Sequence, residues 1–246
     1  MLAFLRFGLA AIAGWLVYLS YEPHGYALIG VAGIALFYIS LMPWPRRFTR
    51  ATGMAGQAQE RPAGSFGALL GFTHGLFCYL FLLPWIGEFV GAMPYVALSV
   101  TMALYAIATG IFGVLVARWR FGFAAFPLIY LVVEFLRSSV PFGGFSWVRL
   151  AWGQINGPLA NLAPWGGPAL VTVAAALVGT AAVAAWSHDR WVRITAATTV
   201  GVTIGLGLLS GLAVDRPSAN VGEVRAAAVQ GNVPRMGLDF NAQRRA

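Results

Sequence analysis

The sequence predicts an all-α polytopic membrane bundle of about seven transmembrane helices, followed by the start of a separate domain. Of its 246 residues, 59% are hydrophobic and 10% are charged, whereas a soluble domain carries about 25% charged residues. A mean hydropathy of +0.74 agrees with an integral membrane protein. So few charges cannot cover a water-facing surface, and the single cysteine excludes a disulfide scaffold.

Seven apolar segments account for the expected bundle. A helix that crosses the hydrocarbon core needs about 20 mostly apolar residues, because its backbone polar groups must be paired within the segment. The fifth segment is the shortest and contains Pro127. The expected helices cover about residues 2–19, 26–42, 66–86, 93–117, 121–136, 169–186 and 194–214.

The placement of the arginines predicts the orientation. All 16 basic residues are arginine, and cytoplasmic loops of membrane proteins are enriched in basic residues. On one side the count is nine: Arg6, Arg46, Arg47, Arg50, Arg61, Arg118, Arg120, Arg190 and Arg193. The opposite loops carry three: Arg137, Arg149 and Arg216. We therefore expect a multi-pass protein of the cell membrane, with a cytoplasmic N-terminus and an extracytoplasmic C-terminus.

The net charge of +8 raises the question of a nucleic-acid partner. Such proteins gather their basic residues on one solvated face. Here the arginines stand in ones and twos at the ends of apolar runs. We expect a lipid bilayer and no nucleic acid as partner.

Residues 138–168 break the hydropathy pattern between the fifth and sixth helices. This connection is rich in aromatic residues, glycine and proline, and long connections in compact domains are often functional. Glu134 and Arg137 stand just before it with the i,i+3 spacing that shares one helix face. Two interpretations stay open: a polar site that grips a lipid headgroup, or an ion pair that anchors the loop.

Within the loop, three further residues are candidate substrate contacts. Trp147 suits the membrane interface, where a ring and an N–H are both satisfied. Arg149 suits a phosphate, which it can meet with two hydrogen bonds. Gln154 follows on the same loop. The alternative is an aromatic belt with an arginine that reaches up to the interface.

Other reactive side chains give no catalytic pattern. Cys78 lies four residues after His74 among apolar neighbours, which favours packing over nucleophilic catalysis. No metal-ligand spacing and no phosphate-binding glycine loop is present. We expect no catalytic residue, no metal and no cofactor in this chain.

The last thirty residues differ from the bundle. Residues 224–229 have the composition of a short strand, and a turn at Gly231-Asn232-Val233-Pro234 follows. A lone strand is unstable outside a sheet. The sequence thus predicts a helical membrane domain over residues 1–215 and the truncated beginning of a second, extracytoplasmic domain over residues 216–246.

Several motifs together resemble bacterial apolipoprotein N-acyltransferases, in particular actinobacterial members. The strand at 224–229 with Gln230-Gly231-Asn232-Val233-Pro234 resembles the first strand of that family's α/β nitrilase-like domain. The order of helices first and strand second agrees as well. The motifs in the bundle are Glu134-Phe135-Leu136-Arg137, Gly144-Phe145-Ser146-Trp147, Gln154, Pro158-Leu159-Ala160-Asn161-Leu162-Ala163 and Gly166-Gly167.

The resemblance implies an enzyme that moves an acyl chain from a phospholipid to the N-terminal diacylglyceryl-cysteine of lipoproteins. In the family a Glu, a Lys and a Cys of the nitrilase-like domain perform the transfer, and no residue here matches them. Because the sequence contains no lysine, we expect this chain alone to be inactive. The alternative is a non-catalytic membrane scaffold for a partner such as a polyprenol-phosphate glycosyltransferase.

Overall fold

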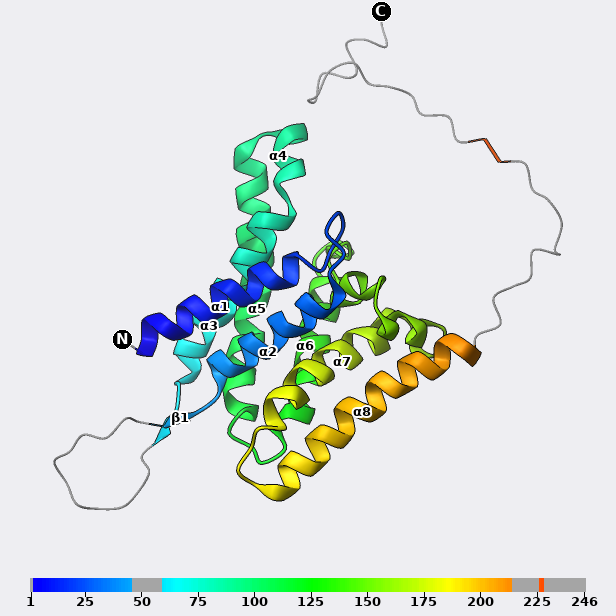
Figure 1. The fold of residues 1–246 in the computed structure, drawn as a ribbon. Helices are drawn as coiled ribbons and strands as arrows, with labels where there is room; N and C mark the ends of the chain where they lie inside the picture. The colour runs from blue at the N-terminus through cyan, green and yellow to red at the C-terminus, as the bar shows by residue number, and fades with distance from the viewer. Residues whose placement is uncertain (1, 46–58, 214–225, 228–246) are drawn as a thin grey trace, which may run out of the picture.

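The computed structural model describes residues 2–45, 59–213 and 226–227. Over these ranges it is a bundle of helices (Figure 1). In chain order the elements are α1 (Leu2–Tyr18), α2 (Ala27–Leu41), β1 (Trp44–Pro45), β2 (Gln59–Glu60), α3 (Gly64–Leu82), α4 (Pro84–Val90), α5 (Ala92–Val116), α6 (Gly122–Arg137), the 3-10 helices η1 (Leu150–Gln154) and η2 (Pro158–Leu162), α7 (Ala163–Ala184) and α8 (Arg190–Ala213).

Each of the seven expected segments contains a helix, with two differences. The third segment divides at Leu83, and Pro84 opens the short helix α4, because proline fits the first turn of a helix and not its interior. The sixth segment begins early, at Ala163. Gly166 and Gly167 interrupt it with non-helical backbone, and the φ of +61° at Gly167 is accessible mainly to glycine.

Four segments of the described chain are long and apolar enough to cross a membrane: Gly64–Leu82, Ala92–Val116, Pro158–Ala184 and Arg190–Ala213. The helices α1, α2 and α6 have 17, 15 and 16 residues. At about 1.5 Å per residue they reach about 25 Å or less, which is below the roughly 30 Å of the hydrocarbon core. The fold is therefore of the membrane type, and seven crossings stay a prediction.

Some expectations fall on residues outside the described ranges. Arg46, Arg47, Arg50 and Arg216 are among them, as is the strand at 224–229 apart from Ala226 and Ala227. The division into domains at residue 215 stays a prediction for the same reason. The strands that the structure does describe, β1 and β2, pair antiparallel, with Trp44 opposite Glu60 and Pro45 opposite Gln59.

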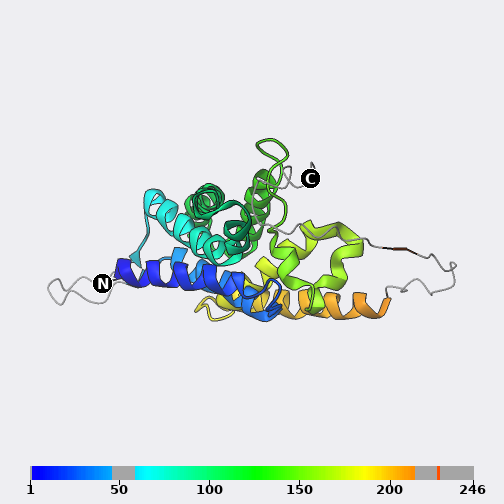
Figure 2. The same cartoon turned by 90° about the horizontal axis from the view of Figure 1, so that it is seen from above.

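Small residues let the helices pack closely. A Cβ added to Gly110 on α5 would lie 1.9 Å from the carbonyl oxygen of Gly67 on α3. One added to Gly71 would lie 2.1 Å from the carbonyl oxygen of Ala106. Contacts of this kind between small residues drive helix association in lipid. Seen from above, α3 and α5 lie on one side of the bundle and α8 runs along the other (Figure 2).

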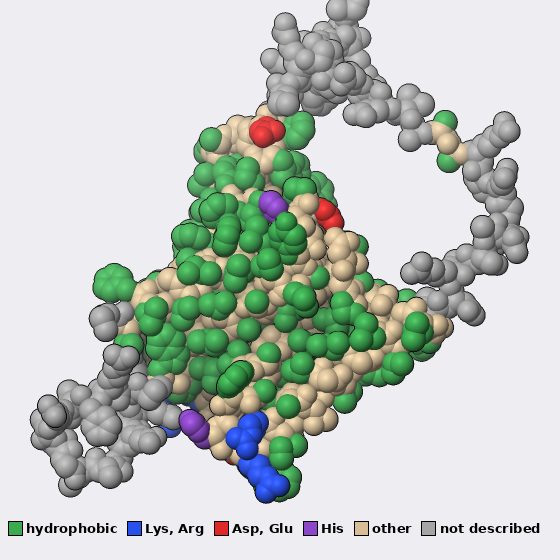
Figure 3. Space-filling model, viewed as in Figure 1, with side chains coloured by type: hydrophobic (Ala, Val, Ile, Leu, Met, Phe, Trp, Pro, Cys, Tyr) green, Lys and Arg blue, Asp and Glu red, His purple; other side chains and the backbone are tan. Residues whose placement is uncertain are grey.

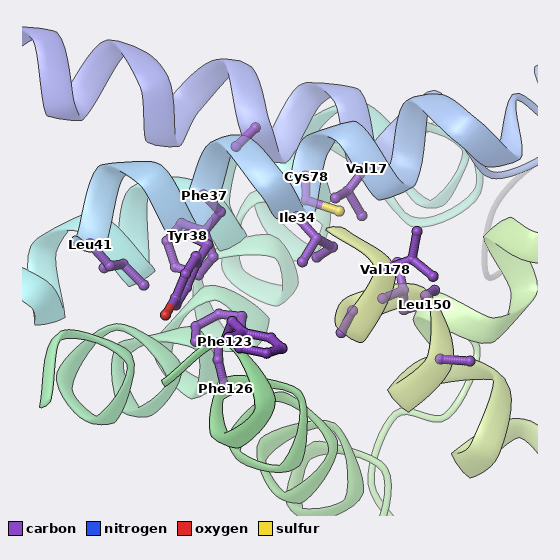
Figure 4. Packing of buried hydrophobic residues seen from close by; sticks show 14 of the residues in the cluster. Val17, Ile34, Phe37, Tyr38, Leu41, Cys78, Phe123, Phe126, Leu150 and Val178 are labelled. Atoms are coloured by element: carbon purple, nitrogen blue, oxygen red, sulfur yellow. The ribbon is translucent and has the colours of Figure 1, made fainter. Parts of the chain in front are cut away.

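Large apolar side chains from several helices fill the centre. Phe37 from α2 and Phe126 from α6 are fully buried, with ring centroids 6.1 Å apart. Cys78 points into the same packing beside Val17 and Ile34 (Figure 4). Its surroundings are therefore apolar on the side of α1 and α2, in agreement with a packing role.

The two ends of the bundle differ in charge. Hydrogen bonds hold one end together: Arg6 donates to the carbonyl oxygens of Ser40 and Met42, and Arg118 donates to that of Pro62. We call this end of the bundle the arginine end. Of the arginines that the structure describes, it carries Arg6, Arg61, Arg118, Arg120, Arg190 and Arg193.

The opposite end, here named the loop end, carries residues 138–162. It also carries Glu22 and Glu88, and of the described arginines it has only Arg137 and Arg149. Figure 3 shows basic side chains at the lower extremity, acidic ones toward the upper extremity, and a hydrophobic surface between them. The alternation of sides expected from the arginines is therefore present in the fold, because consecutive connections lie at opposite ends.

Candidate functional site at the loop end

Glu134 binds the loop that follows its own helix. Its side chain is buried near the end of α6, with 6% exposed. Oε2 accepts a hydrogen bond from the backbone N–H of Leu150 at 2.8 Å, and Oε1 accepts one from Thr172 Oγ1 on α7, also at 2.8 Å. Thr172 in turn accepts the N–H of Ala151 at 3.3 Å. The carboxylate thus joins α6, η1 and α7.

Arg137 binds the same loop through its carbonyl groups. The guanidinium is buried, with 4% of the residue exposed. It donates to the carbonyl oxygen of Phe145 at 2.6 Å and to that of Val148. Its charged group also lies 5.9 Å from the ring centroid of Tyr79 on α3. The guanidinium therefore fixes the first half of the loop against α6.

Glu134 and Arg137 do not form an ion pair with each other. The i,i+3 spacing places them on one face, but within the described chain the one ion pair joins Arg120 and Asp189. Each partner instead satisfies backbone groups of residues 145–150. The two charges thus anchor the loop by separate contacts, without the ion pair of the second sequence interpretation, and contact with a lipid headgroup stays a prediction.

The loop presents Trp147 and Arg149 beside these anchors. Trp147 is 65% exposed and stacks on Trp85 of α4, with ring centroids 5.6 Å apart. Arg149 is half-buried, and its Nε is buried with no hydrogen-bond partner among the described residues. An unsatisfied buried N–H is costly. Arg149 therefore keeps hydrogen-bonding capacity that no described residue uses.

Gln154 is used by the fold. It is almost fully buried in η1, with 1% exposed. Its amide donates to the carbonyl oxygens of Ala27 at 3.1 Å and Gly153 at 3.2 Å. Nearby, Asn156 donates to Glu22 at 2.9 Å. These contacts tie the loop to the start of α2, and the substrate contact expected of Gln154 stays a prediction.

A polar cavity under the loop was not expected from the sequence. It has a volume of about 40 Å³, room for roughly two or three water molecules. Its walls come from α3, α5, α6 and the turn after α1. Besides Glu134 and Arg137 the polar lining residues are Tyr21, His74, Cys78, Tyr79, Tyr105, Thr109 and Tyr130.

Beside the charges of Glu134 and Arg137, this cavity presents neutral hydrogen-bonding groups. His74 is 4% exposed, and its Nδ1 has no partner among the described residues. Burial raises the pKa of the Tyr21 hydroxyl well above its usual range, so this group stays a neutral donor. The sequence did hold a signal: Tyr130, Glu134 and Arg137 recur at helical spacing on one face of α6.

The chain is similar to one family of membrane enzymes. The family model described as apolipoprotein N-acyltransferase N-terminal domain matches residues 13–181. An apolipoprotein N-acyltransferase of Mycolicibacterium smegmatis is 38% identical over 257 aligned residues, which cover 96% of this chain and 40% of that protein.

More distant relatives carry the same name. The one from Photobacterium profundum is 28% identical over 243 residues, covering 93% of this chain and 43% of the relative. The one from Vibrio vulnificus is 30% identical over 204 residues, covering 81% and 38%. This chain thus spans less than half the length of these relatives. It belongs to the apolipoprotein N-acyltransferase family, whose N-terminal domain it contains.

Proposed function

We propose that this chain forms the membrane part of an enzyme that transfers an acyl chain from a phospholipid to the N-terminal diacylglyceryl-cysteine of lipoproteins. Membership of the family supports the type of reaction. The proposed location of the substrate site rests on the loop over residues 138–162. The buried charges of Glu134 and Arg137 hold this loop against the end of an otherwise apolar bundle. The comparisons lend no support to a scaffold for a glycosyltransferase.

The five candidate residues divide into two roles. Glu134, Arg137 and Gln154 position the loop, since their polar atoms bind backbone groups. Arg149 and Trp147 contact the phospholipid. A guanidinium can meet a phosphate with two hydrogen bonds, and an exposed indole suits the headgroup region.

The orientation follows from the charge of the two ends. The arginine end faces the cytoplasm, because basic residues are retained on that side of membranes. The loop end then lies in the extracytoplasmic half of the bilayer, and α8 ends on the same side. The substrates reach the loop end from the outer leaflet.

The acyl transfer itself needs residues that this chain does not hold. In the resembling family a cysteine accepts the acyl group as a thioester, and a Glu and a Lys assist it. This sequence has no lysine, and Cys78 is packed in the helical core. An acyl-transfer assay on the 246-residue chain alone should therefore give no turnover, and turnover would refute this assignment.

Arg149→Ala tests the proposed lipid contact in an enzyme that joins this membrane part to the family's catalytic domain. Loss of a charged hydrogen bond to phosphate, about 1.5–3 kcal/mol, should raise KM for phospholipid on the order of 10- to 100-fold and leave kcat nearly unchanged. Arg190→Ala, an exposed arginine at the arginine end, is the matched control. Equal KM values for the wild type and Arg149→Ala, at equal expression, would refute the contact.

A further inference from the structure

A second cavity lies at the arginine end, far from the loop that the proposed function uses. Its volume is about 240 Å³, close to the lower limit of small-molecule sites, about 300 Å³. It lies between the end of α2, the α5–α6 turn and the α7–α8 turn. Residues that line it include Tyr38, Trp119, Arg120, Phe123, Val183 and Trp186.

The walls of this cavity are apolar in its interior and more polar at its opening. Phe123 is buried and Val183 half-buried, and Tyr38 beside them is 3% exposed. At the opening, Trp119 and Trp186 are 63% and 89% exposed. Tryptophan gathers where hydrocarbon meets headgroups. The gradient therefore suits an amphiphile with its apolar part inside and its polar part at the opening.

Arg120 supplies a cation at the opening. Its side chain is 55% exposed, and it donates from Nε at 2.8 Å and from one terminal nitrogen at 3.2 Å to the carboxylate of Asp189. A guanidinium has five N–H donors, so three remain after these bonds. Because an exposed ion pair is weak, a phosphate can bind beside Asp189 or replace it.

The charge of the arginine end favours an anionic ligand. Among the side chains that the structure describes, the arginine end carries six arginines and one acidic residue, Asp189. Basic pockets between transmembrane helices attract anionic headgroups. We propose that the arginine-end cavity binds one anionic phospholipid, with the phosphate at Arg120 and part of an acyl chain against Phe123 and Val183. The site is separate from the proposed acyl-donor contact at Arg149.

Native mass spectrometry of the chain, released from mild detergent micelles with added lipid, tests the site. Phosphatidylglycerol should be retained in preference to phosphatidylethanolamine. Arg120→Gln should lower retention of phosphatidylglycerol about tenfold, the effect of about 1.4 kcal/mol from a charged hydrogen bond. Arg190→Gln, an exposed arginine outside the cavity, should change it less than twofold.

A second variant distinguishes lipid binding inside the cavity from attraction of lipid to surface charge. Ala184 lines the cavity, and Ala184→Phe should exclude both lipids by filling it. Equal losses for Arg120→Gln and Arg190→Gln would overturn the site in favour of diffuse attraction to charge. Equal retention of the two lipids, or displacement of phosphatidylglycerol by glycerol 3-phosphate at equal concentration, would also overturn it. Since Arg120 is exposed, its variant keeps the test valid if Ala184→Phe fails to fold.

Discussion

At the loop end the charges of Glu134 and Arg137 are buried and bind backbone groups, whereas at the arginine end Arg120 and Asp189 are exposed and bind each other. A buried charge must have every partner in place, because an unsatisfied group in a low-dielectric interior is costly. An exposed pair exchanges its contacts with water at little cost. The comparison indicates that Glu134 and Arg137 shape the fold at the loop end, whereas the exposed pair of Arg120 and Asp189 remains available for a ligand.

Removing a buried anchor should have the largest effect. Arg137→Ala leaves the carbonyl oxygens of Phe145 and Val148 without their donor, and we expect a loss of about 3 kcal/mol of stability from unsatisfied polar groups. Thermal unfolding in detergent measures this loss, with Arg190→Ala as the control at the other end. Equal unfolding midpoints for Arg137→Ala and Arg190→Ala would contradict the proposed difference between the loop end and the arginine end.

The helices were predictable because lipid imposes a length and an apolar composition on each segment. Hydropathy located a helix in each of the seven segments, of which four are long and apolar enough to cross a membrane. It did not locate the break at Leu83, where Pro84 starts a new helix, or the early start of α7, because both depend on single prolines and glycines inside apolar runs. In these places local backbone preference outweighs hydropathy.

The candidate site was predictable only in part. Polarity identified Glu134 and Arg137, but their partners are backbone groups and a threonine up to 38 residues away in sequence, and no periodicity encodes such pairs. Gln154 is a stronger example, since its amide reaches the carbonyl of Ala27 across 127 residues. The helical spacing of Tyr130, Glu134 and Arg137 indicates one wall of the polar cavity, but the other walls come from distant elements. In the sequence, the tyrosines of this cavity look like ordinary aromatic residues. Only in the fold do four elements bring them together.

Thr172→Val is a milder test of the loop end. Valine keeps the shape of threonine but removes the hydroxyl that donates to Glu134 and accepts from Ala151. We expect a loss of about 1–2 kcal/mol, because a buried carboxylate loses one of its two bonds. The measurement is again the unfolding midpoint, with Thr195→Val on the exposed face of α8 as control. A loss as large as that of Arg137→Ala would mean that Thr172 holds the loop as strongly as Arg137 does.

The smallest effect should come from the exposed pair, and pH reveals it. The hydrogen bonds from Arg120 hold the pKa of Asp189 below its usual range. A carboxyl with a lowered folded-state pKa stabilises the fold above its unfolded pKa, about 3.9. That contribution is lost as the pH falls through the lower, folded value.

Asp189→Asn isolates this contribution. Asp189 also accepts the N–H groups of Trp191 and Val192 at the start of α8, and asparagine caps helices about as well as aspartate. The variant should therefore unfold at a slightly lower temperature than the wild type at pH 7, and the difference should shrink as the pH falls below about 3.9. A large difference at pH 7 would show that the pair at the arginine end is structural, like the anchors at the loop end, and that Arg120 is not free to bind a phosphate.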